Sequence, residues 1–88
     1  MDPVKDNLIA CAEALFVSDL DPSGQPSDEQ IRTAIRDMRW GPASLPRRER
    51  LARRAQAYGE NQESAAARMR WALAATSRVL HVAEAGRG

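Results

Sequence analysis

The sequence contains a single cysteine and a single histidine, and this scarcity excludes several kinds of site. One cysteine cannot form a disulfide within the chain, and one cysteine with one histidine cannot complete a tetrahedral zinc site. Three internal glycines, Gly24, Gly41 and Gly59, lie far apart, so no glycine-rich phosphate-binding loop is present. Because no Gly-x-Ser-x-Gly or paired-histidine motif occurs either, we predict a non-catalytic protein without cofactor or metal.

Long apolar runs are also missing. The longest uncharged apolar run, residues 71–75, is much shorter than the roughly 20 residues that cross a bilayer. Residues 1–3 lack the basic region of a secretory signal. The formal net charge of +1 does not steer the whole chain toward nucleic acid or away from acidic surfaces. We expect a cytoplasmic protein without membrane attachment.

The 88 residues, of which 43% are hydrophobic, suffice for one domain spanning 1–88. A chain of this size buries roughly 60–65% of its unfolded surface, so its core is thin. A second copy or another protein that covers apolar surface would compensate for this.

Helix start and stop signals divide the chain into four helices. Starts are marked by Asp2–Pro3, by a capping box from Ser27 to Gln30, by Pro46 (with Ser44 as a candidate cap) and by Asn61. Stops are the turn-forming residues 21–26, Gly41–Pro42 and Gly59, and residues 86–88 read as a frayed tail. Apolar residues recur with a period of 3.6, and no alternating run indicates a strand. We predict an all-α bundle of four helices, near 3–18, 28–40, 46–58 and 61–84.

The last predicted helix is the longest, and it is apolar around more than half of its circumference. Such a helix is buried, either at the centre of a fold or at an interface. We expect the other three helices to pack around it, with Trp40 and Trp71 as large buried anchors. Its second apolar side is the predicted interface with a protein partner or another copy of the chain. The residues of that side are Trp71, Ala75, Val79 and Val82.

Charge is unevenly distributed along the chain. Residues 1–30 hold seven acidic side chains and one basic one, whereas residues 31–60 hold eight arginines and three acidic residues. Arg47, Arg50 and Arg54 share one side of their helix. They form either a solvated helix face or a basic patch for nucleic acid or an acidic protein.

A helix-turn-helix arrangement is the main alternative for function. Ala55 and Gly59 have the spacing at which that motif places a small residue and the turn glycine, but Arg54, Glu60 and Arg68 occupy positions that it leaves apolar. In this alternative a small DNA-binding regulator uses the third and fourth helices. Its nucleic-acid contacts would be Arg47, Arg50, Arg54, Gln62 and Arg70.

Cys11 and His81 are the remaining reactive side chains. Cys11 lies on the apolar stripe of the first helix, and we predict a small buried hydrophobe. His81 lies late in the last helix, where we expect a surface or half-buried imidazole. The alternatives to these two interpretations are a Cys–His dyad formed by Cys11 and His81, or a pH switch based on His81.

Two stretches carry a resemblance. Residues 7–22 and 58–72 resemble the first segment and the closing helix of small uncharacterised actinobacterial helical proteins. The resemblance implies a small bacterial all-α domain and brings no activity with it. Together with the thin core, this favours a non-catalytic module that binds protein, or a copy of itself, through the last helix and its neighbours in a regulatory or scaffolding role.

Overall fold

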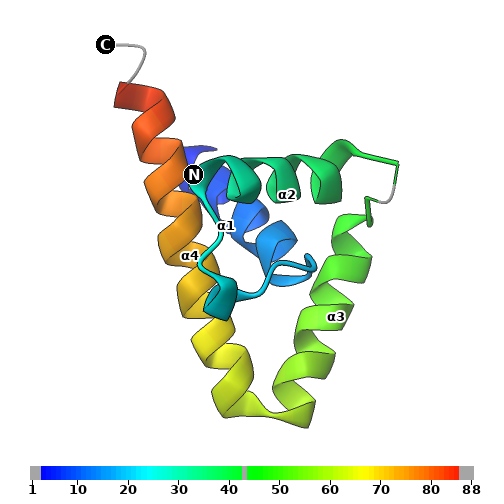
Figure 1. Cartoon of the computed structure of the whole chain (residues 1–88). Coiled ribbons are helices and arrows are strands. Elements are labelled where there is room, and N and C mark those ends of the chain that lie inside the picture. Colours follow the sequence, from blue (N-terminus) through cyan, green and yellow to red (C-terminus); the bar gives the residue numbers. More distant parts are fainter. Residues whose placement is uncertain (1–2, 43, 86–88) are drawn as a thin grey trace.

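A computed structural model of the chain shows four α-helices and one short 3₁₀-helix (Figure 1). The structure describes residues 3–42 and 44–85, and the side chains within 7–42 and 44–80. No strand occurs within these ranges, which confirms the predicted all-α class; the tail predicted over 86–88 lies outside them. The elements are α1 (Pro3–Phe16), η1 (Pro22–Gly24), α2 (Asp28–Trp40), α3 (Arg47–Glu60) and α4 (Gln62–Ala85).

The longest helix, α4, contacts all three of the others, as predicted. In Figure 1 it runs along one side of the molecule, with α2 across the top, α3 on the opposite side and α1 between them. α1 is a second central element, because six consecutive residues from Cys11 to Phe16 are all buried. Six residues cover more than one helical turn, so neighbours enclose this half of α1 on every side.

The core forms where α1, α2 and α4 meet. α4 contributes one face whose members recur every three or four residues, as the predicted period requires. Leu15 of α1 and Ile31 and Ile35 of α2 complete this core, and Tyr58 of α3 stacks on Phe16 with ring centroids 6.3 Å apart. The buried hydrophobic residues of α4 are Ala65, Met69, Ala72, Ala75 and Val79.

The expectation that Trp40 is a buried anchor is wrong. Its side chain is 67% exposed, and among the described side chains it is the large hydrophobic residue left at the surface. Trp40 follows Ile35 by five positions, which places it about 140° around the helix from that core residue. The other tryptophan, Trp71, is half-buried against the core.

The bounds of α2 agree with those predicted, because both of its end signals are used. Gln30 N donates to Ser27 Oγ at 3.2 Å, and Ser27 N donates to Gln30 Oε1 at 2.7 Å, which completes the capping box. At the other end, a Cβ on Gly41 would lie 2.7 Å from the carbonyl oxygen of Asp37. Glycine is therefore required here by close approach rather than by a left-handed backbone, since its φ is −76°.

Other boundaries differ from the prediction. α1 ends at Phe16 instead of residue 18, where Ser18 N and Oγ both donate to the carbonyl of Leu15. α3 begins after Pro46, without a side-chain cap from Ser44. It also continues through Gly59 to Glu60, so the connection to α4 is the single residue Asn61. Asn61 N closes α3 on Ala57 O, and its Oδ1 accepts from Ser64 N at 3.0 Å to start α4.

Candidate functional site

Three of the predicted contact arginines lie on the side of α3 that packs against α1, but only Arg50 is buried: Arg47 is exposed and Arg54 is half-buried. Arg47 Nε and Arg54 Nη1 lie 4.0 and 3.9 Å from the carboxylate of Glu13, a residue of α1 that is only 2% exposed. Arg50 between them is 6% exposed and donates from Nη1 to Leu45 O at 2.6 Å. They share one side of α3, as predicted, but this side packs against α1.

The contact between α1 and α3 is incompletely hydrogen-bonded. Glu13 Oε2 and Arg50 Nε are buried and have no hydrogen-bond partner among the described atoms. Burying polar atoms in this way costs free energy, which the attraction between these charges and the stacking of Tyr58 on Phe16 offset. The sequence pattern indicated a charged helix face without showing that a buried glutamate opposes it.

The remaining predicted nucleic-acid contacts lie on α4. Gln62 and Arg70 are both exposed and lie eight positions apart. Gly59, the proposed turn residue of a helix-turn-helix, is inside α3 instead of in a turn. Of the predicted nucleic-acid contacts, Arg47, Gln62 and Arg70 are exposed, whereas Arg50 is buried.

Arg68 has a structural role that the sequence pattern did not reveal. Its guanidinium donates to three backbone carbonyls at the end of α1, those of Phe16, Ser18 and Leu20, at 2.7, 2.9 and 3.0 Å. It also lies 5.3 Å from the centroid of the Trp71 ring. Burial lowers the pKa of Arg68, and the nearby negative charge of Asp21 opposes that shift. This arginine fixes the end of α1 to the start of α4.

Two of the four residues of the apolar interface predicted on α4 are used within the subunit. Ala75 and Val79 are each 2% exposed, because they belong to the core that α4 forms with the other helices. They are therefore not accessible to another molecule in this fold. Trp71 keeps partial exposure, and Val82 lies outside the described side chains.

Cys11 is buried, as predicted, with 4% of its surface exposed. Arg39 of α2 donates from Nη1 to Cys11 Sγ at 3.2 Å and to Asn7 Oδ1 at 2.9 Å. The same guanidinium lies 4.4 Å from the centroid of the Trp40 ring. Arg39 thus connects α1 to the exposed tryptophan, through two hydrogen bonds and a cation–π contact. The side chain of His81 lies outside the described residues, so the Cys–His alternative stays untested.

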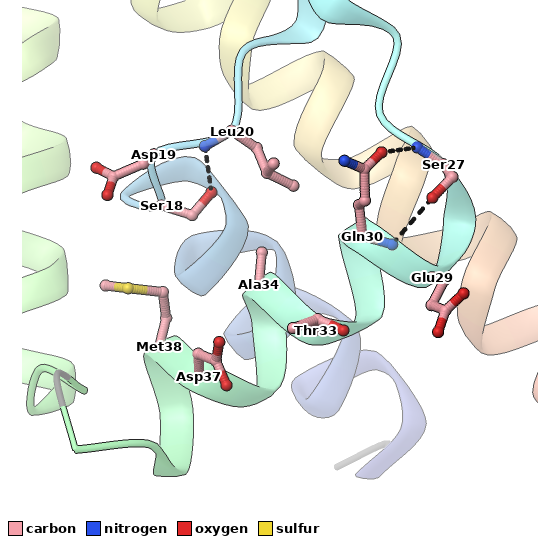
Figure 2. A pocket seen from close by; sticks show the side chains of 10 residues that line it. All are labelled: Ser18, Asp19, Leu20, Ser27, Glu29, Gln30, Thr33, Ala34, Asp37 and Met38. Carbon is pink, nitrogen blue, oxygen red and sulfur yellow. Dashed lines mark hydrogen bonds between the residues drawn. The ribbon is translucent and has the colours of Figure 1, made fainter.

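A groove of about 620 Å³ lies on the described surface between the segment after α1 and one side of α2 (Figure 2). Leu20 projects into it from the loop above and Ala34 from α2 below, with Met38 and Asp19 at one end and Ser27 and Gln30 at the other. We call it the acidic groove. Its lining residues are Ser18, Asp19, Leu20, Ser27, Glu29, Gln30, Thr33, Ala34, Asp37 and Met38.

The acidic groove combines an apolar floor with three carboxylates. Leu20, Ala34 and Met38 are only partly buried, so they offer apolar surface that the subunit does not cover. No lysine or arginine lines the groove, and the ion pairs found among the described residues do not involve Asp19, Glu29 or Asp37. A groove of this kind favours a ligand that is apolar at its centre and positively charged around it.

Two other kinds of site are absent from the described part of the chain. No group of three or more histidine, cysteine, aspartate or glutamate side chains there could hold a metal ion. No helix there is long and apolar enough to span a membrane. Comparison of the chain with protein-family models, curated proteins and solved structures finds no match. The resemblance to actinobacterial helical proteins stays a prediction.

Proposed function

We propose that this chain is a non-catalytic helical module that binds protein through the acidic groove, in a scaffolding or regulatory role in the bacterial cytoplasm. The observation that carries the proposal is the open apolar floor of Leu20, Ala34 and Met38 beside carboxylates that no described cation neutralises. The groove replaces the α4 surface expected from the sequence, because Ala75 and Val79 are inside the core.

The chemistry of the groove defines the segment that it would bind. An apolar anchor would displace water from Leu20, Ala34 and Met38, and burying such surface contributes about 25 cal/mol per Å². Arginine or lysine residues beside the anchor would pair with Asp19, Glu29 and Asp37 at the rim. These pairs remain near water, so they favour fast association and selectivity more than affinity.

A peptide titration followed by nuclear magnetic resonance tests this proposal. We expect a helical peptide with leucines on one face and arginines beside them to shift backbone amides of residues 18–20 and 29–38. Two control peptides separate the apolar from the electrostatic contribution to binding. One replaces leucine by serine, and the other replaces arginine by glutamate. If all three peptides act alike, or if the shifted amides lie elsewhere, the groove is not a protein-binding site.

The alternative, a DNA-binding regulator, has less support. Arg50 is buried and occupied with Leu45 O, and Arg47 and Arg54 each lie about 4 Å from the Glu13 carboxylate, which offsets part of the positive charge that a phosphate would meet. Retention on duplex DNA that falls steeply with salt would favour the alternative over our proposal.

A further inference from the structure

We infer that the partner of the acidic groove is a second copy of this chain, which inserts its Trp40 ring between the groove's apolar floor and its carboxylates. This inference rests on the proposed function and names the protein that the groove binds. The inserted surface consists of Arg36, Arg39 and Trp40 at the end of α2, and we call it the Trp40 corner.

The Trp40 corner has the composition that the acidic groove lacks. Trp40 is 67% exposed, and Arg36 beside it on α2 is also exposed. Leaving so large an apolar ring in water gives up about 150–250 Å² of burial, which association with a suitable surface would recover. Tryptophan and arginine are the residues that most often dominate the energy of protein interfaces.

The exposed ring already has one contact within its own subunit. The Arg39 guanidinium stacks 4.4 Å from the ring centroid, and its hydrogen bonds to Asn7 and Cys11 fix the guanidinium to α1. A side chain that is already ordered loses less conformational entropy on binding. This distinguishes Trp40 from an exposed side chain that moves freely.

The charges of the two surfaces are complementary. Asp19, Asp37 and Met38 lie toward one end of the groove (Figure 2). In the assembly, the two carboxylates would pair with Arg36 and Arg39 of the incoming copy, and the Met38 thioether would contact its indole ring. Groove volume is also adequate, since about 620 Å³ lies within the 300–1,000 Å³ typical of ligand pockets.

Both surfaces belong to α2, and they are two different parts of it. The groove uses one side of α2 around Ala34 and Met38, whereas the Trp40 corner is at its C-terminal end. Two different surfaces can meet head-to-tail, which gives a ring or an open chain, or reciprocally about a two-fold axis, which gives a closed pair with two such contacts. In either assembly, every interface joins one groove to one Trp40 corner.

Sedimentation equilibrium on the full chain tests the inference with two variants. Trp40→Ala removes the anchor, and Asp19→Lys with Asp37→Lys reverses charge at the groove; all three residues are partly or fully exposed, so the fold is retained. We expect the unaltered chain to gain average mass over a roughly hundredfold range of concentration, whereas each variant alone stays monomeric. As a matched control, Glu49→Lys with Glu60→Lys makes the same charge change on α3 and leaves assembly intact.

An equimolar mixture of the two variants gives the decisive result. One variant has an intact groove and the other an intact Trp40 corner, so the contact between these two restores one interface and gives a heterodimer that cannot grow further. A mixture that stays monomeric, a Trp40→Ala variant that assembles normally, or an unaltered chain that is monomeric throughout would each overturn the inference. A monomeric chain that still binds the arginine–leucine peptide would leave the proposed function standing.

Discussion

Two groups of arginines in this protein do opposite things. Arg50 and Arg68 lie in the fold and donate to backbone carbonyls, at distances between 2.6 and 3.0 Å. Arg36 and Arg39 flank an exposed tryptophan, and Arg36 is itself exposed. The comparison teaches that the number of arginines in a segment does not indicate a binding surface; the carbonyls and carboxylates that each one meets decide its role.

The largest effect on stability should come from Arg68→Ala. This change leaves the carbonyls of Phe16, Ser18 and Leu20 without their shared donor, and it removes the contact with Trp71. We expect a loss of about 2–3 kcal/mol in unfolding free energy, or roughly 10–20 °C in melting temperature. Thermal unfolding followed by circular dichroism measures this. As a control, Arg70→Ala changes an exposed arginine of the same helix and should change the unfolding free energy by less than about 0.5 kcal/mol. Equal losses for the two variants would contradict the structural role of Arg68.

A smaller effect is expected from Arg50→Ala. Its bond to Leu45 O fixes the segment before α3, but its Nε is buried without a partner, so removing the charge also relieves a desolvation cost. After these opposing contributions, we expect the unfolding free energy to fall by about 1–2 kcal/mol. Urea unfolding of this variant is compared with Arg48→Ala, whose side chain is exposed on the same turn. An Arg50 variant as stable as the Arg48 variant would show that the bond to Leu45 contributes nothing.

Arg36, the exposed member of the second group, should behave in the opposite way. Arg36→Gln removes a surface charge, so unfolding free energy should change by less than about 0.5 kcal/mol. Assembly should weaken by about threefold to tenfold and become less sensitive to salt, because one of the pairs at the groove is lost. Sedimentation at low and at high salt measures both quantities. A variant that unfolds more easily and assembles normally would place Arg36 with the structural arginines.

The smallest effect concerns Asp21, whose charge lies near Arg68. Ser23 N donates to Asp21 Oδ1 at 3.0 Å, and this hydrogen bond lowers the pKa of Asp21 below its ordinary value of 3.8. The folded state therefore holds its proton less tightly than the unfolded state. The resulting stability is present above about pH 4 and is lost as the pH falls through the lowered pKa. The unfolding free energy of the Asp21→Asn variant, measured across acidic pH, should lack this pH-dependent contribution. Parallel pH profiles for the variant and the unaltered chain would contradict the expectation.

Local signals in the sequence predicted most of the fold. The Ser27 capping box and the Gly41–Pro42 stop gave both ends of α2, since each acts within a few residues. The helix stop predicted at Gly59 is wrong, because a glycine is tolerated within an exposed stretch of helix. α3 ends instead before its C-cap residue Asn61, whose side chain also caps the start of α4.

The candidate site was harder to predict because it depends on distant contacts. Arg68 meets Phe16 across 52 positions of sequence, and nothing near Arg68 indicates that partner. The acidic groove likewise joins the loop after α1 to the side of α2, so its carboxylates read as ordinary surface charges. Exposure of Trp40 could have been foreseen from its spacing to Ile35, whereas the stacking of Arg39 on its ring could not.

The contact between Met38 and Trp40 of two different molecules is the most direct test of the account. The Trp40→Ala variant, carrying ¹³C only in its methionine methyl groups, is mixed with the unlabelled Asp19→Lys and Asp37→Lys variant. We predict a filtered nuclear Overhauser effect between the Met38 methyl group and indole protons of the unlabelled chain. Association of the two variants without this signal, or with a signal only at Met69, would contradict the account.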